Sequence, residues 1–395
     1  MRRNKKNRRD NRAFALGLCV SMALTSTAWA GPEFAYSGEK WERLRDNVME
    51  YEELADLIHE YNPVVINSRL EYDEYRGKSH EDLKRAYEKE ADGLYSSSDK
   101  MEESAEEGAP GYDSAMATAA LARIQAEEKL DMADAQNEDS YVKKMEYDRL
   151  EASLVQQAQT KMNTYWQKEK GSSALREAVL TAKGDYGAVA LKVEEGMATQ
   201  GELLSAREKA ESAQAEAEAN EKEMDTLKRE LCVMTGWSYD AQPEMGEIPL
   251  PSQEEIDSIL LEEDKKVAIE RNYVQKANEQ RLKNTGQGSR YDVLEKKVTS
   301  GRQQIASDVE DKYKLLKEAQ SDYALTDGKY QLALQNQQSA SLRYELGTIS
   351  RNEFLGSRGS LKGTQSARDV AALKLVQAME NYRWSVNGLA QTEGS

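Results

Sequence analysis

Two carboxylates stand at the same place in two similar stretches of the sequence. Glu202 and Glu353 each lie six residues after a glycine, Gly196 and Gly347, and an apolar pair follows each acid. The two glycines are 151 positions apart in a chain of 395 residues. An acid at the start of a helix is favourably placed toward the positive end of the helix dipole, which is one reading of both residues. The repetition predicts a chain built twice on one plan.

Other chemistry-bearing patterns are missing from the sequence. The two histidines, His59 and His80, belong to no His-Glu-x-x-His or Cys-His set, and no glycine loop has the context of a phosphate site. Cys232 lies between Leu231 and Val233, which favours packing over reactivity. We therefore expect no enzyme activity, no cofactor, no catalytic residue and no metal site.

Composition and charge point to exported long helices. The chain is 39% hydrophobic and 32% charged with six prolines, as long helices and coiled coils are. Basic residues at 2–12, an apolar run from 14 to 25 and a small-x-small site at Ala28-Trp29-Ala30 predict a signal peptide over 1–30. Its removal leaves 47 basic and 70 acidic residues, a net charge of −23. So acidic a surface argues against nucleic-acid binding.

Helical periodicity divides the mature chain into two halves. We expect a first helical repeat over 31–236, a proline-containing linker over 237–252 and a second repeat over 253–395. The helices expected are 39–61, 63–94, 113–195, 199–235, 253–283, 289–346 and 350–389, with a loop at 96–112 and soft spots at Gly171 and Gly184. When the two halves are aligned at Asn62 and Asn272, the segments between these asparagines and the glycine turns have similar lengths. The segments on the other side of the asparagines, here called the upper arms, have unequal lengths. The fold class is therefore all-α, made of long antiparallel helical hairpins in two tandem repeats.

The helix before Gly347 carries a coiled-coil register. Large residues recur every seven positions, with small residues between them, at Leu316, Tyr323, Tyr330, Gln337 and Tyr344. Such a heptad pattern is typical of a helix that packs along its length against another helix.

The order of these features resembles the TolC-type outer-membrane efflux protein family. The opening Leu-Ile-His-Glu-Tyr-Asn-Pro at 57–63, the two glycine turns and the segment from Met224 to Thr235-Gly236 carry the resemblance. It implies an α-barrel protomer that assembles as a homotrimer and works with a periplasmic adaptor and an inner-membrane transporter in the cell envelope. By resemblance, the turns Glu195-Gly196-Met197 and Leu346-Gly347-Thr348 contact the adaptor, and Glu202 and Glu353 line the tunnel entrance.

Two departures from the family stand out. Ile349 and Gly356 occupy positions where the family often has charged residues, which weakens the expectation of a locked entrance. The family's four membrane β-strands need about 40 residues, whereas the corresponding places offer 17 residues at 96–112 and five at 284–288. The sequence thus predicts a relative that lacks the membrane strands.

Two functions remain open from the sequence. The first is an efflux or export duct with transmembrane transport activity, and the second is a structural coiled-coil scaffold of the envelope without transport. A trimer that encloses a lumen would distinguish them.

Overall fold

The computed structural model describes residues 36–392, and the predicted signal peptide, 1–30, lies outside the described residues. The chain divides into two units, Met1–Val48 and Met49–Ser395. The described part of the first unit contains α1 (Gly38–Arg43), whose first turn is capped by the Ser37 hydroxyl. A two-residue strand, β1 (Val48–Met49), follows. All other elements belong to the second unit.

The first half of the second unit is a set of helices that meet at Asn62. It contains η1 (Tyr51–Glu53), α2 (Leu54–Tyr61), α3 (Pro63–Tyr75), α6 (Ser140–Glu194) and α7 (Gln200–Met234). The buried Asn62 caps α3 by accepting from the Val64 N–H at 2.9 Å, and its Nδ2 donates to the Met234 carbonyl at 2.8 Å. One side chain therefore fixes the start of α3 to the end of α7.

The second half repeats this construction at Asn272. Its elements are β2 (Glu244–Met245), α8 (Gln253–Asp257), α9 (Leu261–Arg271), α10 (Tyr273–Asn284), α11 (Ser289–Glu345), α12 (Arg351–Trp384) and η2 (Ser385–Leu389). Asn272 caps α10 through the Gln275 N–H at 2.9 Å and donates to the Ala390 carbonyl at 2.8 Å. Corresponding helices have nearly equal lengths: 13 and 12 residues for α3 and α10, 55 and 57 for α6 and α11, 35 and 34 for α7 and α12. The predicted tandem repeat is confirmed.

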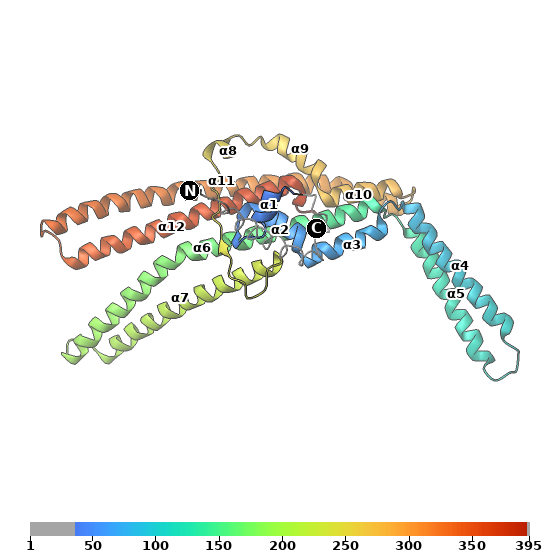
Figure 1. Ribbon diagram of the computed structural model, residues 1–395, viewed down its shortest axis with the longest axis horizontal. Helices are drawn as coiled ribbons and strands as arrows, with labels where there is room; N and C mark the ends of the chain where they lie inside the picture. The colour runs from blue at the N-terminus through green and yellow to red at the C-terminus, as the bar shows by residue number, and fades with distance from the viewer. Residues whose placement is uncertain (1–35, 393–395) are drawn as a thin grey trace, which may run out of the picture. The chain divides into compact units, whose positions relative to one another are not determined.

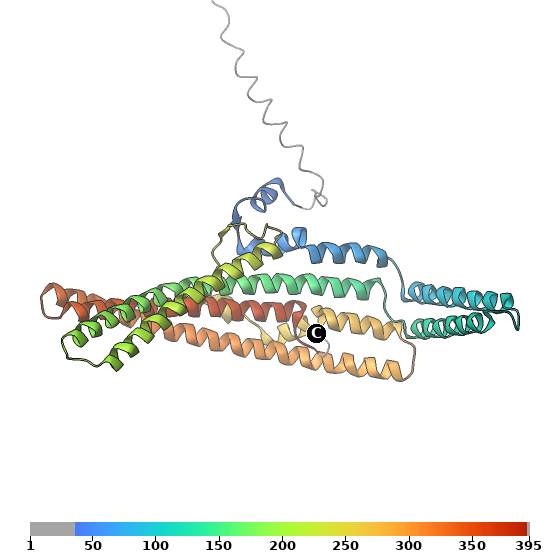
Figure 2. The same ribbon diagram turned by 90° about the horizontal axis from the view of Figure 1, so that it is seen from below.

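The long helices lie side by side in one layer. α6 packs against α3 and α7 on one side and against α10 and α12 on the other, and α11 packs against α10 and α12. Figures 1 and 2 show α6 between these neighbours. The layer therefore has two edges that no other long helix covers, one formed by α3 and α7 and the other by α11.

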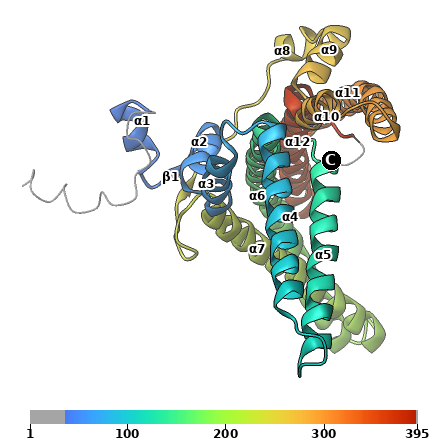
Figure 3. The same cartoon turned by 90° about the vertical axis from the view of Figure 1, so that its right-hand side faces the viewer.

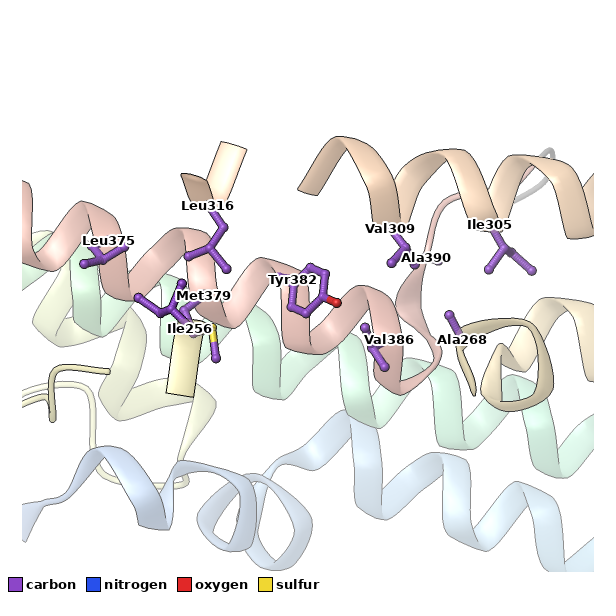
Figure 4. Packing of buried hydrophobic residues seen from close by; sticks show 10 residues of the cluster. All are labelled: Ile256, Ala268, Ile305, Val309, Leu316, Leu375, Met379, Tyr382, Val386 and Ala390. Carbon is purple, nitrogen blue, oxygen red and sulfur yellow. The ribbon is translucent and has the colours of Figure 1, made fainter. Parts of the chain in front are cut away.

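Packing within the layer follows the predicted heptads. Leu316 is fully buried, Tyr323 packs against the same cluster, and Arg368 of α12 lies over the Tyr330 ring, with 4.5 Å between the guanidinium carbon and the ring centroid. The cluster joins α8, α9, α11, α12 and η2 (Figure 4). Its ten buried members are Ile256, Ala268, Ile305, Val309, Leu316, Leu375, Met379, Tyr382, Val386 and Ala390.

A helical hairpin accounts for the apparent mismatch between the upper arms. The sequence predicted one helix over 63–94 and another over 113–195, and both predictions are wrong. The first helix ends at Tyr75, and α4 (His80–Ser104) and α5 (Tyr112–Ala135) form a separate hairpin before α6 begins (Figure 3). The chain breaks at Gly77, which has φ +77°, and restarts at a capping box of Ser79 and Asp82. Without this hairpin the upper arms agree.

Other boundaries also differ from the prediction. The expected helix over 39–61 is divided among α1, β1, η1 and α2, and the expected helix over 253–283 is divided among α8, α9 and α10. Conversely, α6 is unbroken at Gly171 and Gly184. A glycine within a helix costs about 1 kcal/mol, which packing along such a long helix offsets.

Candidate functional site

Two helix-to-helix turns with one backbone plan form the candidate site. At the end of α6, Gly196 has φ +74°, and its N–H donates to the Val193 carbonyl at 3.0 Å. The next N–H, of Met197, donates to the Lys192 carbonyl at 2.7 Å. These two bonds define a Schellman ending, which needs a left-handed residue at the glycine position.

The turn between α11 and α12 is built in the same way. Gly347 has φ +71°, and its N–H donates to the Tyr344 carbonyl at 3.0 Å. The Thr348 N–H donates to the Arg343 carbonyl at 2.8 Å. The glycine that the sequence singled out in each half thus has the same conformational role in both.

The two predicted entrance acids close capping boxes one turn further on. Glu202 accepts from the Thr199 N–H at 2.7 Å and from the Thr199 hydroxyl at 2.9 Å. Glu353 accepts from the Ser350 N–H at 2.8 Å. Each hydroxyl in turn accepts from the N–H of its glutamate at 3.2 Å. These hydrogen bonds hold the pKa of both carboxyls below the usual value for glutamate, and the bond from the backbone N–H has the largest effect.

This contact supports the reading of Glu202 and Glu353 as first-turn acids of their helices. It does not single them out, because Ser79 and Asp82 form the same capping box at the start of α4. Capping uses only one face of each carboxylate and leaves both side chains exposed. The acids can therefore cap their own helices and still present negative charge to solvent.

The pKa directions predict how the turns respond to acid. A carboxyl whose folded pKa is lowered stabilises the fold above its unfolded pKa, about 4.3 for glutamate, and this contribution is lost as the pH falls through the folded pKa. We expect hydrogen exchange at the Thr199 and Ser350 amides to lose protection in that acidic range. Glu202→Gln and Glu353→Gln should make this protection independent of pH, since glutamine also serves in a capping box.

The Gln275 amide is the internal control for this measurement. It is capped by the neutral side chain of Asn272 at 2.9 Å, so it should keep its protection over the same pH range. Loss of protection at all three amides together would contradict titration of the caps.

Exposed apolar side chains surround both turns. The exposed fractions are 68% for Met197 and 78% for Leu346. Leu191, Leu204 and Leu342 nearby are also exposed, while Tyr344 and Phe354 stack with 4.8 Å between ring centroids. Side chains of this kind on two matching turns suit contact with another protein.

The two turns lie at the same end of the layer. Asn163 of α6 donates to the Leu373 carbonyl of α12, and further along α6 the Lys170 carbonyl accepts from Ser366. Advancing along α6 therefore means going backward along α12, so the two helices are antiparallel. The end of α6 and the start of α12 therefore lie toward the same end of the layer, and Figure 1 shows both turns at that end.

Other candidate chemistry gives no second site. Within 36–392, no group of His, Cys, Asp and Glu is placed to hold a metal ion. In the same residues, no helix has the length and apolar content that crossing a membrane would take. Burial raises the pKa of the Cys232 thiol, as expected for a packed cysteine. His59 lies against Glu151 at 2.7 Å, and this hydrogen bond raises the pKa of the imidazole.

Comparison with known proteins relates the chain to others by fold. No protein-family model and no curated protein matches the sequence. Among solved structures, a membrane protein from Pseudomonas aeruginosa matches with a TM-score of 0.51 and 13% identity, over 86% of this chain and 90% of that chain. The long-hairpin, all-α fold predicted from the sequence is confirmed.

Outer-membrane proteins are also among the matching structures. The CmeC outer membrane channel of Campylobacter jejuni matches with a TM-score of 0.48 and 10% identity, over 90% of this chain and 88% of that chain. The outer membrane protein VceC of Vibrio cholerae matches with a TM-score of 0.47 and 13% identity, over 90% of this chain and 100% of that chain.

Sequence reasoning identified both turns but missed two features. It did not find the α4–α5 hairpin, although Gly77 and the Ser79-x-x-Asp82 capping box signal its start. It also did not notice two exposed leucines of α11, Leu325 and Leu332, each 57% exposed.

Proposed function

We propose that this protein is the tunnel component of a tripartite-type export system. Three copies form a helical duct that works with an adaptor protein and an inner-membrane transporter in the cell envelope, and the protein is not an enzyme. The observation that carries this proposal is the single layer of long helices with two open edges and two matching turns at one end. Open edges on both sides allow copies to join edge to edge until the layer closes on itself.

The proposal gives the two turns distinct tasks. The residues at the tips, Glu195-Gly196-Met197 and Leu346-Gly347-Thr348, contact the adaptor, for which the exposed Met197 and Leu346 offer apolar area. Glu202 and Glu353 follow in the next turn and face the duct entrance. In a trimer they place six carboxylates around one axis, an arrangement that favours cations. Mutual repulsion then raises the pKa of these carboxyls and opposes the effect of the caps.

The assembly is tested with the mature chain, residues 31–395. Light scattering should give the mass of a trimer. A bis-maleimide of short reach should cross-link Glu202→Cys, and separately Glu353→Cys, into covalent dimers, because equivalent residues of two copies meet near one axis and each copy offers one accessible thiol. The native Cys232 is fully buried and does not compete.

The matched control is Asp82→Cys, which removes a capping box of the same kind from α4, away from the two turns. It should remain uncross-linked. A monomer at high concentration, or equal cross-linking of all three variants, would contradict the duct. The scaffold without transport would then be the better description of the protein.

A further inference from the structure

The hairpin of α4 and α5 has a surface that nothing in the described chain covers. Within 36–392, the two helices pack extensively only against each other. Their seam is made of small residues, and the Ser98 hydroxyl donates to the Ala119 carbonyl across it at 2.9 Å. Other buried residues of the seam are Ala91, Ala122, Ala126 and Ala133. Small side chains bury little apolar area, so the hairpin gains less from its own packing than a leucine seam would provide.

A groove runs between the two helices on one face of the hairpin. Its lining residues are Glu90, Gly93 and Leu94 of α4 and Gln125, Glu128, Lys129 and Met132 of α5. At Gly93, a Cβ would meet no atom within 4 Å, so the glycine leaves the groove open at its centre. Met132 is 49% exposed. The side chains along one face of another helix can pack into an open groove that has an exposed apolar rim.

The spacing along α5 suits a third helix. Leu121, Gln125, Glu128 and Met132 follow each other at intervals of four, three and four residues, the period of a coiled-coil seam. Leu121 is 59% exposed, although such a position is normally covered by a partner helix. This row of positions on α5 is therefore available for contact with a third helix.

The net charge of the hairpin determines which kind of partner helix it attracts. Residues 80–135 carry 15 acidic and six basic side chains, a net charge of −9. Within the groove Lys129 pairs with Glu90 at 2.6 Å, whereas the exposed Glu128 offers its charge to solvent. A second copy of the hairpin would add another −9 and be repelled, while a cationic helix would be attracted.

We propose that the α4–α5 groove binds a basic amphipathic helix of a partner protein and completes a three-helix coiled coil with it. The partner helix places small apolar residues against Gly93 and Leu121, and its lysines or arginines lie beside Glu128. This inference does not depend on the proposed duct, because it uses only contacts within the hairpin and the charge of the hairpin.

The test uses two synthetic helices of three heptads as probes. One has alanine and leucine at the seam and lysine at the flanking positions, and the other has glutamate in place of lysine. Binding to the full mature chain is followed by fluorescence anisotropy at low and high salt. The lysine peptide should bind, with an affinity that falls as salt rises, and the glutamate peptide should not.

Two adjacent acids provide a matched pair of variants. Glu128→Lys changes the groove, and Glu127→Lys makes the same charge change at an exposed position outside the groove lining. We expect the affinity for the lysine peptide to fall about tenfold or more with Glu128→Lys, and about threefold or less with Glu127→Lys. Gly93→Leu should abolish binding by filling the groove. It raises helix propensity, so α4 stays folded.

Several outcomes would overturn the proposal. These are equal weakening by the two lysine substitutions, binding of both peptides or of neither, and unchanged binding in Gly93→Leu. If Gly93→Leu instead changes the mass of the native assembly, the groove is occupied by a second copy of this chain and the proposal fails.

Discussion

Replacing Gly236 by alanine is expected to destabilise the protein far more than the same replacement at Gly196. Both glycines have a left-handed backbone, with φ +79° and φ +74°. For a residue with a Cβ this costs about 1–2 kcal/mol. At Gly236 the added Cβ would also lie 2.3 Å from the Cβ of Tyr61, whereas at Gly196 it would meet nothing within 4 Å.

The collision at Gly236 cannot be relieved by rotating a side chain. The Tyr61 Cβ is fixed to the backbone, and the next residue, Asn62, holds the end of α7 through the Met234 carbonyl. Moving Tyr61 therefore breaks the joint between α3 and α7. Overpacking of this kind adds about 1–3 kcal/mol to the backbone cost.

Urea unfolding of the four glycine variants measures this order. Gly236→Ala should lower the free energy of unfolding most, and Gly388→Ala should follow, because its Cβ would lie 2.9 Å from the Tyr273 ring and 3.0 Å from the Arg271 carbonyl. Gly196→Ala and Gly347→Ala, with open space around both, are the controls. Equal effects at all four positions would show that backbone strain alone matters and that the joint at Asn62 does not.

The repeat was predictable from the sequence because local signals coincide with it. The helices α7 and α11 lack proline, each turn has a glycine, and each following helix begins with a hydroxyl residue three positions before a glutamate. The heptad row from Leu316 onward was sufficient to predict the face of α11 that packs. Signals of this kind act within a few residues and can be read without knowing the partners.

The interruptions were harder to predict because no proline marks them. The chain leaves α5 at Gln136 and begins α6 after Asp139, whose carboxylate accepts from the Val142 N–H at 2.8 Å. Asp139 also accepts from Gln280 and Asn284 of α10. These partners lie more than 140 positions away in the sequence, so the break depends on tertiary contacts that a local pattern does not contain.

The candidate site is predictable only in part for a related reason. Glycine and glutamate positions define the turns, and the capping boxes explain them within one chain. Whether the same carboxylates also line a duct depends on symmetry-related copies. Contacts between copies would be made by residues on the open edges of the layer. The exposed leucines there therefore say more about assembly than the residues of the turns do.

A double substitution on the open edge of α11, Leu325→Asp with Leu332→Asp, is expected to convert the proposed trimer into monomers. Tyr323 and Tyr330 face the packed side of α11, and each leucine is two residues further on, roughly 200° around the helix. Leu332 thus lies on the side of α11 away from that packing, and Leu325 borders an open groove that α11 forms with Ala367 and Val370 of α12. Each is 57% exposed in the single chain, so aspartate should change the folding free energy of a protomer by about 0.5 kcal/mol or less per site.

In a closed ring the same positions are covered by the next copy. Burying an unpaired carboxylate there costs several kcal/mol by order of magnitude, enough to abolish assembly at micromolar concentration. Light scattering should give a monomer mass, with unchanged helicity by circular dichroism. The control is Leu180→Asp with Leu260→Asp, at leucines that are 65% and 59% exposed but do not lie on α11. A trimer in both double variants would exclude the α11 edge as the interface, and monomers in both would mean that added charge alone prevents assembly.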